Sequence, residues 1–138
     1  APAGRVLKAV ALPELYPKMI RAISDVTVHS RTPALTDFSW TFGFSVFGMK
    51  SRNHLTVLPD GIQVKGVEGD LADAAWRWQV FPRGERTVVA YHGWANIPRA
   101  AYILKVSMKR EPYLEHGFMA GSNMVMVRAV RRTVEAKP

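Results

Sequence analysis

The stretch FSWTFGFSV, residues 38–46, decides the fold that the sequence predicts. Aromatic and small residues alternate along it with a period of two, which is the period of a β-strand. Successive side chains of a strand point to opposite faces, so the aromatic residues share one face of the predicted sheet. This aromatic row consists of Phe38, Trp40, Phe42 and Phe44. We expect it to face the interior, because large aromatic side chains gain most from burial.

Further strands are predicted on both sides of the aromatic row. Strand-like patterns occur in residues 20–31, 55–58, 62–65, 74–81 and 87–95. Pro59-Asp60-Gly61 and Pro82-Arg83-Gly84 predict tight turns, because proline presets φ and glycine accepts positive φ. About six strands joined by short connections favour an antiparallel meander.

Helical patterns occupy the two ends of the chain. Residues 4–12 form a short apolar stripe, and residues 99–109 predict a short helix or a lid-like loop. Residues 112–135 predict a helix about 36 Å long that opens at Pro112. Its expected apolar stripe is Tyr113, Gly117, Ala120, Met124, Val127, Val130 and Val134, widened by Leu114, Phe118, Gly121 and Val125. The predicted fold class is α+β, a curved antiparallel sheet wrapped around a long C-terminal helix.

Composition limits the classes of protein that the chain can represent. It has 138 residues, with 19 Lys+Arg against 11 Asp+Glu, so the net charge is +8. The absence of cysteine excludes a disulfide framework, a thiolate zinc site and a cysteine nucleophile. No apolar run approaches the roughly 18 residues of a membrane-spanning helix. The basic residues are spread along the chain, so nucleic acid is an unlikely partner.

The order of these elements resembles the START-like superfamily, the helix-grip fold of polyketide cyclases, pollen-allergen-type proteins and ubiquinone-binding proteins. The resemblance is carried by residues 15–31, 38–46, 55–58, 68–70, 75–78 and 87–91 and by the long terminal helix. It implies one START-like domain over residues 1–138 with an internal hydrophobic cavity, and it implies no catalytic residue. Family members usually begin with a strand, whereas this chain has almost nothing before Gly4. We therefore expect the first strand to be missing, with the open edge paired by another segment or subunit.

The candidate ligand-binding residues surround this implied cavity. They are Phe38, Trp40, Phe42, Phe44, Trp76, Trp78, Tyr91, Gly117, Gly121 and Met124. Aromatic residues on a buried face can equally fill a core. The two helical glycines permit either ligand volume or close backbone approach to the sheet. We expect a lipid, isoprenoid or polyketide-like molecule to bind between the sheet and the C-terminal helix.

An enzyme of the cyclase or aromatase class is the main alternative, and a protein-interaction module with a vestigial cavity is another. His92 beside Tyr91, and His116 beside Glu115, could supply acid–base chemistry. Neighbours in a strand point to opposite faces, so Tyr91 and His92 cannot both line a cavity unless a bulge intervenes. The four histidines lack metal-ligand spacing, so we expect no metal and no cofactor.

A basic segment precedes the terminal helix. Lys105, Lys109 and Arg110 follow the apolar residues 100–104. Aliphatic residues between cations can insert shallowly into an anionic membrane surface, although a solvated basic loop explains the pattern as well. We expect a cytoplasmic protein, while the start at Ala1 leaves export open. The unpaired sheet edge allows a homo-oligomer.

Overall fold

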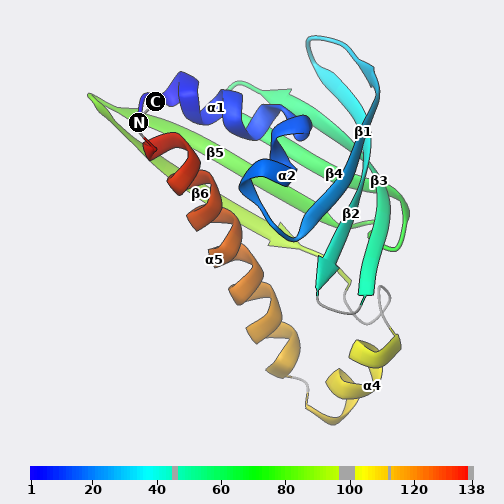
Figure 1. The fold of residues 1–138 in the computed structure, drawn as a ribbon. Helices are drawn as coiled ribbons and strands as arrows, with labels where there is room; N and C mark the ends of the chain where they lie inside the picture. The colour runs from blue at the N-terminus through cyan, green and yellow to red at the C-terminus, as the bar shows by residue number, and fades with distance from the viewer. Residues whose placement is uncertain (45–46, 97–101, 112, 137–138) are drawn as a thin grey trace.

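The computed structural model describes residues 1–44, 47–96, 102–111 and 113–136, without the side chains of residues 44, 47 and 102–104 (Figure 1). Its elements are α1 (Ala3–Ala11), the short 3-10 helix η1 (Pro13–Leu15), α2 (Tyr16–Met19), β1 (Ile23–Arg31), β2 (Leu35–Phe44), β3 (Phe47–Leu58), β4 (Gly61–Gly69), β5 (Ala75–Arg83), β6 (Arg86–Trp94), α4 (Tyr102–Arg110) and α5 (Tyr113–Glu135). The segment before the terminal helix is helical where it is described, and the predicted start at Pro112 lies outside the described residues.

The six strands form one antiparallel sheet in the order β1-β2-β3-β4-β5-β6. The predicted α+β class, with a curved antiparallel sheet and a long C-terminal helix, is confirmed. Register shifts between Ser24 and Thr27 in β1, and between Arg52 and Asn53 in β3, are the kind of irregularity that bends a sheet. Among the described residues no strand precedes α1, so β1 and β6 are the outer strands of the sheet. Pairing of an edge with another subunit stays a prediction.

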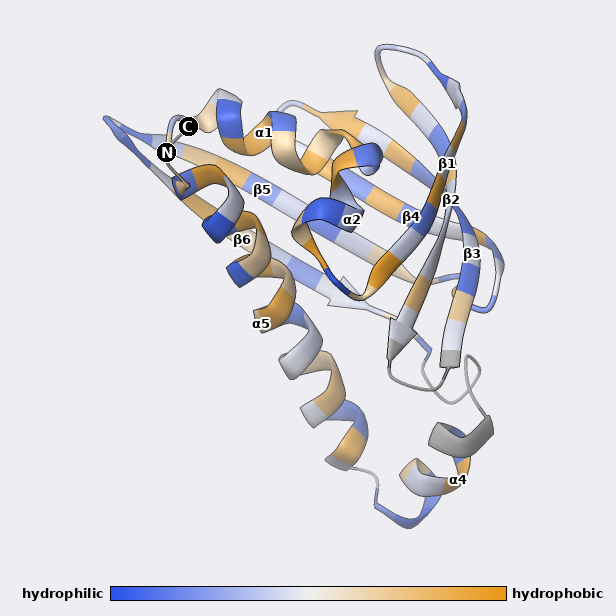
Figure 2. Cartoon of the chain, viewed as in Figure 1, coloured by the Kyte–Doolittle hydropathy of each residue, from blue (hydrophilic) through white to orange (hydrophobic). Residues whose placement is uncertain are grey.

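The aromatic row lies on the inner face of the sheet, the face that α1, α2 and α5 cover (Figure 1). Phe38 is 0% exposed, Trp40 is 3% exposed and Phe42 is half-buried. The rings of Phe38 and Trp40 meet edge to face with centroids 5.4 Å apart. The side chain of Phe44 lies outside the described part of the chain. Figure 2 shows apolar and polar residues alternating along the strands, as the period of two predicts.

The turn at residues 59–61 joins β3 to β4 as predicted. Asp60 in this turn accepts hydrogen bonds from Arg77 and Gln79, which lie on the outer face of β5. Gly61 is required there, because its φ is 154° and a Cβ would lie 2.0 Å from the carbonyl oxygen of Trp78. The turn therefore sets the register between β4 and β5.

Helix α5 is anchored at its C-terminal half. Met126, Ala129, Val130 and Val134 are buried in the same core cluster as residues of α1 and the sheet. Arg5 of α1 also donates a 2.8 Å hydrogen bond to the carbonyl oxygen of Ala136. The N-terminal half of α5 runs past the end of the sheet toward α4 (Figure 1).

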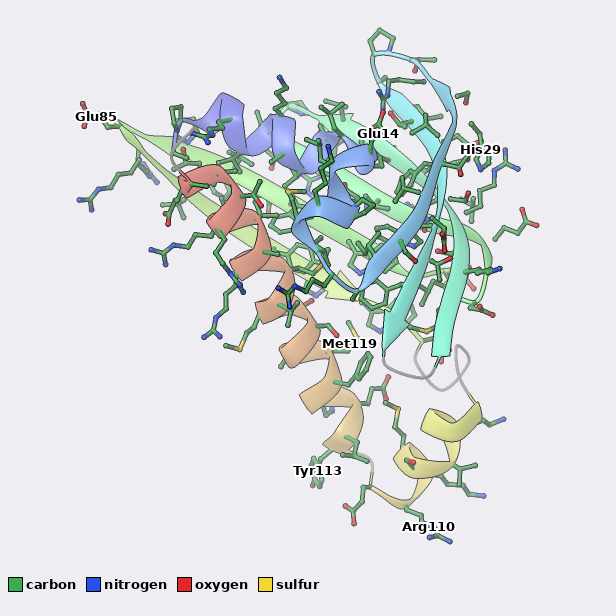
Figure 3. The ribbon with its side chains drawn as sticks, in the orientation of Figure 1. Glu14, His29, Glu85, Arg110, Tyr113 and Met119 are labelled. Carbon is green, nitrogen blue, oxygen red and sulfur yellow. The ribbon has the colours of Figure 1, made fainter. Side chains whose placement is uncertain are left out.

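The predicted buried stripe of α5 is wrong in this N-terminal half, except at the half-buried Phe118. Tyr113 is 82% exposed and Met124 is 55% exposed. The face turned toward the sheet carries Phe118 together with Met119, Ser122, Asn123 and Met126, with Met119 on the sheet side in Figure 3. The true face includes two polar residues, Ser122 and Asn123, so a search for an unbroken apolar stripe selects a neighbouring face of the helix.

Candidate functional site

Two adjoining apolar spaces lie between the sheet and the N-terminal half of α5. The outer groove has a volume of about 300 Å³ and is lined by residues that include Ile20, Ala22, Phe42, Gly117, Gly121 and Val125. The inner cavity has a volume of about 30 Å³ and is lined by residues that include Trp40, Met49, Leu71, Trp76, Tyr91 and Asn123. Phe42, Phe118, Ser122 and Met126 line both spaces. These four residues form the boundary between the outer groove and the inner cavity.

The glycines of α5 border open space. A Cβ built on Gly117 or on Gly121 meets no heavy atom of the described structure within 4 Å, apart from the helix itself. Close backbone approach to the sheet, one of the two explanations open from the sequence, is therefore wrong at both positions. The alternative explanation, unfilled volume beneath the helix, agrees with the geometry.

The polar groups behind the aromatic row form hydrogen bonds with one another. The indole N–H of Trp40 donates to Ser51 Oγ at 2.7 Å, and the Ser51 hydroxyl donates to Asn53 Oδ1 at 3.2 Å. Asn53 is 0% exposed, and its amide donates to the carbonyl oxygen of Ser51. This network fixes the orientation of the Trp40 ring, which forms one wall of the inner cavity.

Tyr91 and His92 point to opposite faces of β6, as the sequence predicts. The Tyr91 ring packs on Trp78 with centroids 4.2 Å apart and lines the inner cavity. Burial, with a smaller contribution from Tyr16, raises the pKa of the Tyr91 phenol. His92 is exposed on the other face, opposite Arg77 in the register with β5. His116 is exposed as well, so neither histidine reaches the inner cavity.

The structure brings together six of the ten candidate ligand-binding residues. Trp40, Phe42, Trp76, Tyr91, Gly117 and Gly121 line the outer groove or the inner cavity. Phe38 and Trp78 line neither space; both belong to the core, where Trp78 borders a void of about 10 Å³ next to Trp40. Met124 is exposed, and Phe44 lies outside the described side chains.

Several lining residues were missed from the sequence. Met49 lies opposite Phe42 in the register of β2 and β3, so a correctly aligned hairpin predicts its position. Phe118, which the predicted apolar stripe included but the candidate ligand-binding residues did not, and Met126 follow the i, i+4 spacing that ends at Val130 and Val134. Asn123 interrupts that face, and no local sequence signal distinguishes it from a surface residue.

The basic residues Lys105, Lys109 and Arg110 are exposed on α4. Met108 of the same helix is 7% exposed and belongs to a buried cluster with Met49 and Leu71. Helix α4 therefore closes the end of the inner face while its cations remain in solvent.

Two other hollows occur in the described structure. One, of about 270 Å³, lies between α1, β6 and the C-terminal end of α5 and is bordered by the ion pair Arg131–Glu135. The other, of about 450 Å³, lies on the outer face of the sheet and is lined by the charged residues Asp25, Lys50, Arg52 and Glu68. In contrast, no charged side chain of the described residues lines the outer groove or the inner cavity.

Among the described residues, no group of three or more His, Asp or Glu side chains could hold a metal ion. No helix in the described ranges has both the length and the apolar character needed to cross a bilayer.

Comparison with known proteins relates the chain to one solved structure. No family model matches the chain, and no curated protein matches it. It is similar to the crystal structure of TTHA0849 from Thermus thermophilus, with a TM-score of 0.69 and 17% sequence identity over 97% of this chain and 90% of that chain. A likeness at this identity concerns the fold alone.

Proposed function

We propose that this chain is a START-like binding module that holds a hydrophobic small molecule in the outer groove and inner cavity. The observation that carries the proposal is the apolar groove of about 300 Å³ beneath Gly117 and Gly121. Its volume falls in the range of small-molecule sites, and its lining is predominantly apolar, as in such sites. The ligand class is a lipid, isoprenoid or polyketide-like compound.

The two glycines support this proposal through helix stability. A glycine inside a helix costs roughly 0.5–1 kcal/mol relative to alanine. At Gly117 and Gly121 an added Cβ meets nothing within 4 Å, so packing does not require glycine at either position. Both glycines weaken the helix, and the space that they leave for a ligand gives a reason for their presence.

The lining favours a binding module over a cyclase or aromatase. General acid–base catalysis needs a titratable side chain within reach of the substrate. Tyr91 is the titratable residue of the described chain that lines the inner cavity, and because burial raises the pKa of its phenol, it stays protonated and cannot act as a base. His92 and His116, the candidate acid–base residues, are exposed elsewhere.

An NMR titration with 1-octanol tests the location of binding. We expect saturable shifts of the backbone amides of Gly117, Gly121 and Ser122, which line the outer groove. The amide of Gly84, in the turn between β5 and β6, serves as the distant control. Shifts confined to Thr87 and Val89 would place the ligand in the hollow beside α1 instead. The absence of saturable shifts would favour the protein-interaction alternative.

We also propose that the end of the molecule formed by α4 and α5 contacts an anionic membrane surface. Apolar side chains are exposed there: Val106 is 44%, Tyr113 82% and Leu114 49% exposed. Lys105, Lys109 and Arg110 lie among them, and Figure 3 shows Arg110 and Tyr113 at the far end of the molecule. Glu111 and Glu115 offset part of this positive charge. Because Gly117 borders the outer groove one turn from Tyr113, such a contact would bring the groove close to the lipid.

A further inference from the structure

Two polar side chains converge inside the predominantly apolar inner cavity, which Ser122 also lines. Tyr91 of β6 and Asn123 of α5 both line it. A Cβ built on Gly93 would lie 2.8 Å from Asn123 Oδ1 and 3.1 Å from Tyr91 Oη. The missing side chain at Gly93 therefore leaves room for both groups to approach one place.

These two groups have unused hydrogen-bonding capacity. Within the described part of the chain, neither the Tyr91 hydroxyl nor the Asn123 amide has a hydrogen-bond partner. Neither counts among fully buried polar atoms without a partner, so each reaches space that a water or a ligand atom can occupy. Because burial raises the pKa of Tyr91, its phenol stays neutral and can donate. The Asn123 amide can both donate and accept.

The charge of the lining restricts the ligand further. The chain has a net charge of +8, yet no Lys, Arg, His, Asp or Glu of the described residues lines the outer groove or the inner cavity. A carboxylate or an ammonium group entering this space loses its hydration and gains no counter-charge. A neutral hydroxyl or carbonyl loses less hydration and can recover hydrogen bonds from Tyr91 and Asn123.

We propose that the ligand is a neutral amphiphile whose terminal hydroxyl or carbonyl oxygen binds between Tyr91 and Asn123. This inference rests on the proposed function and narrows its ligand class. The inner cavity, at about 30 Å³, accommodates a head the size of a water molecule or slightly larger. The elongated apolar body lies in the outer groove of about 300 Å³ and passes Phe42 and Phe118, which line both spaces.

Displacement of a hydrocarbon fluorophore tests this proposal. Diphenylhexatriene has no polar atom, so it reports the apolar groove independently of Tyr91 and Asn123. It is displaced by 1-dodecanol or by ionised dodecanoate, which share one chain length, at an ionic strength that screens the net charge of +8. We expect 1-dodecanol to bind at least about tenfold more tightly than dodecanoate.

Two variants isolate the polar pair. Tyr91→Phe and Asn123→Leu should each weaken 1-dodecanol binding about three- to tenfold relative to the binding of diphenylhexatriene, which has no polar atom to lose a hydrogen bond. Tyr113→Phe removes the same hydroxyl from a residue that is 82% exposed and should change neither affinity. Equal affinity for dodecanoate and 1-dodecanol, or unchanged 1-dodecanol binding in both variants, overturns the proposed role of Tyr91 and Asn123. Neither result contradicts the binding of an apolar ligand in the outer groove. A wild-type protein that does not bind diphenylhexatriene overturns the proposed function itself.

Discussion

Arg5 and Ala136 are 131 positions apart in the sequence, and the Arg5 guanidinium donates a 2.8 Å hydrogen bond to the Ala136 carbonyl oxygen. This bond joins α1 to the C-terminal end of α5, where a helix leaves carbonyl groups without partners and favours a nearby cation. Together with the buried residues Ala129, Val130 and Val134, this bond holds α5 at its C-terminal end, while the other end stands off the sheet.

Arg5→Ala should lower the free energy of unfolding by about 0.5–1.5 kcal/mol, because a hydrogen bond to a helix C-terminus is lost. Urea denaturation followed by circular dichroism measures this change. Arg128→Ala is the matched control, because Arg128 is exposed and no hydrogen bond or ion pair of it is found in the described structure. The control should change stability by less than about 0.5 kcal/mol. Equal effects of the two substitutions would contradict the anchoring role of Arg5.

The pH dependence of stability should depend on Asp37 on the outer face of the sheet. Its carboxylate accepts hydrogen bonds from Arg52 Nε at 2.9 Å and from Arg52 Nη2 at 2.6 Å. The guanidinium, through this hydrogen bonding, lowers the pKa of Asp37. The folded pKa is thus below the unfolded value of about 3.9. The stabilisation of the fold by the Asp37–Arg52 interaction is therefore fully present above the unfolded pKa. It is lost as the pH falls through the folded pKa.

Asp37→Asn should therefore lower stability at neutral pH and reduce the loss of stability below about pH 4. The free energy of unfolding, measured against pH by urea denaturation, tests this. Glu85→Gln makes the same charge change in the exposed turn between β5 and β6, where Figure 3 shows Glu85 at the tip. If the free energy of unfolding of Asp37→Asn fell at acid pH as it does in the wild type, Asp37 would not be the source of the pH dependence.

Membrane contact by the α4–α5 end should depend on Lys105, Lys109 and Arg110. Each cation near an anionic surface contributes about 1 kcal/mol, so their replacement by serine should reduce partitioning more than about a hundredfold at low salt. Co-sedimentation with liposomes measures this. Serine at Lys65, Arg83 and Arg86, all exposed on β4–β6, removes the same charge elsewhere. Equal loss in both triple variants, or equal binding to neutral liposomes, would reject the specific contact.

The sheet could be predicted from the sequence because its signals are local. Phe38, Trp40 and Phe42 alternate with small residues, so this period places them on one face, and their large apolar side chains assign that face to the interior. The turn at residues 59–61 was equally clear, since proline and glycine restrict the backbone wherever they occur.

The face of α5 could not be predicted in the same way. Met124 has the hydropathy of a core residue and is 55% exposed, whereas Asn123 has that of a surface residue and lines the inner cavity. Near the anchored end, at Val130 and Val134, burial follows hydropathy. Where the helix stands off the sheet, its rotation depends on the packing of Met126 and on α4, contacts that no local pattern encodes.

The measurement that tests the central claim most directly is diphenylhexatriene binding by Gly121→Leu, compared with Ala120→Leu. Leucine at position 121 enters the outer groove, where a Cβ has free space, and it is a better helix former than glycine by roughly 0.5–1 kcal/mol. Leucine at the neighbouring Ala120 adds the same side chain on the exposed side of the helix. We predict that Gly121→Leu keeps or gains thermal stability and loses binding at least about tenfold, while Ala120→Leu binds as the wild type does. Wild-type affinity in a folded Gly121→Leu protein would contradict the claim that the ligand lies beneath α5.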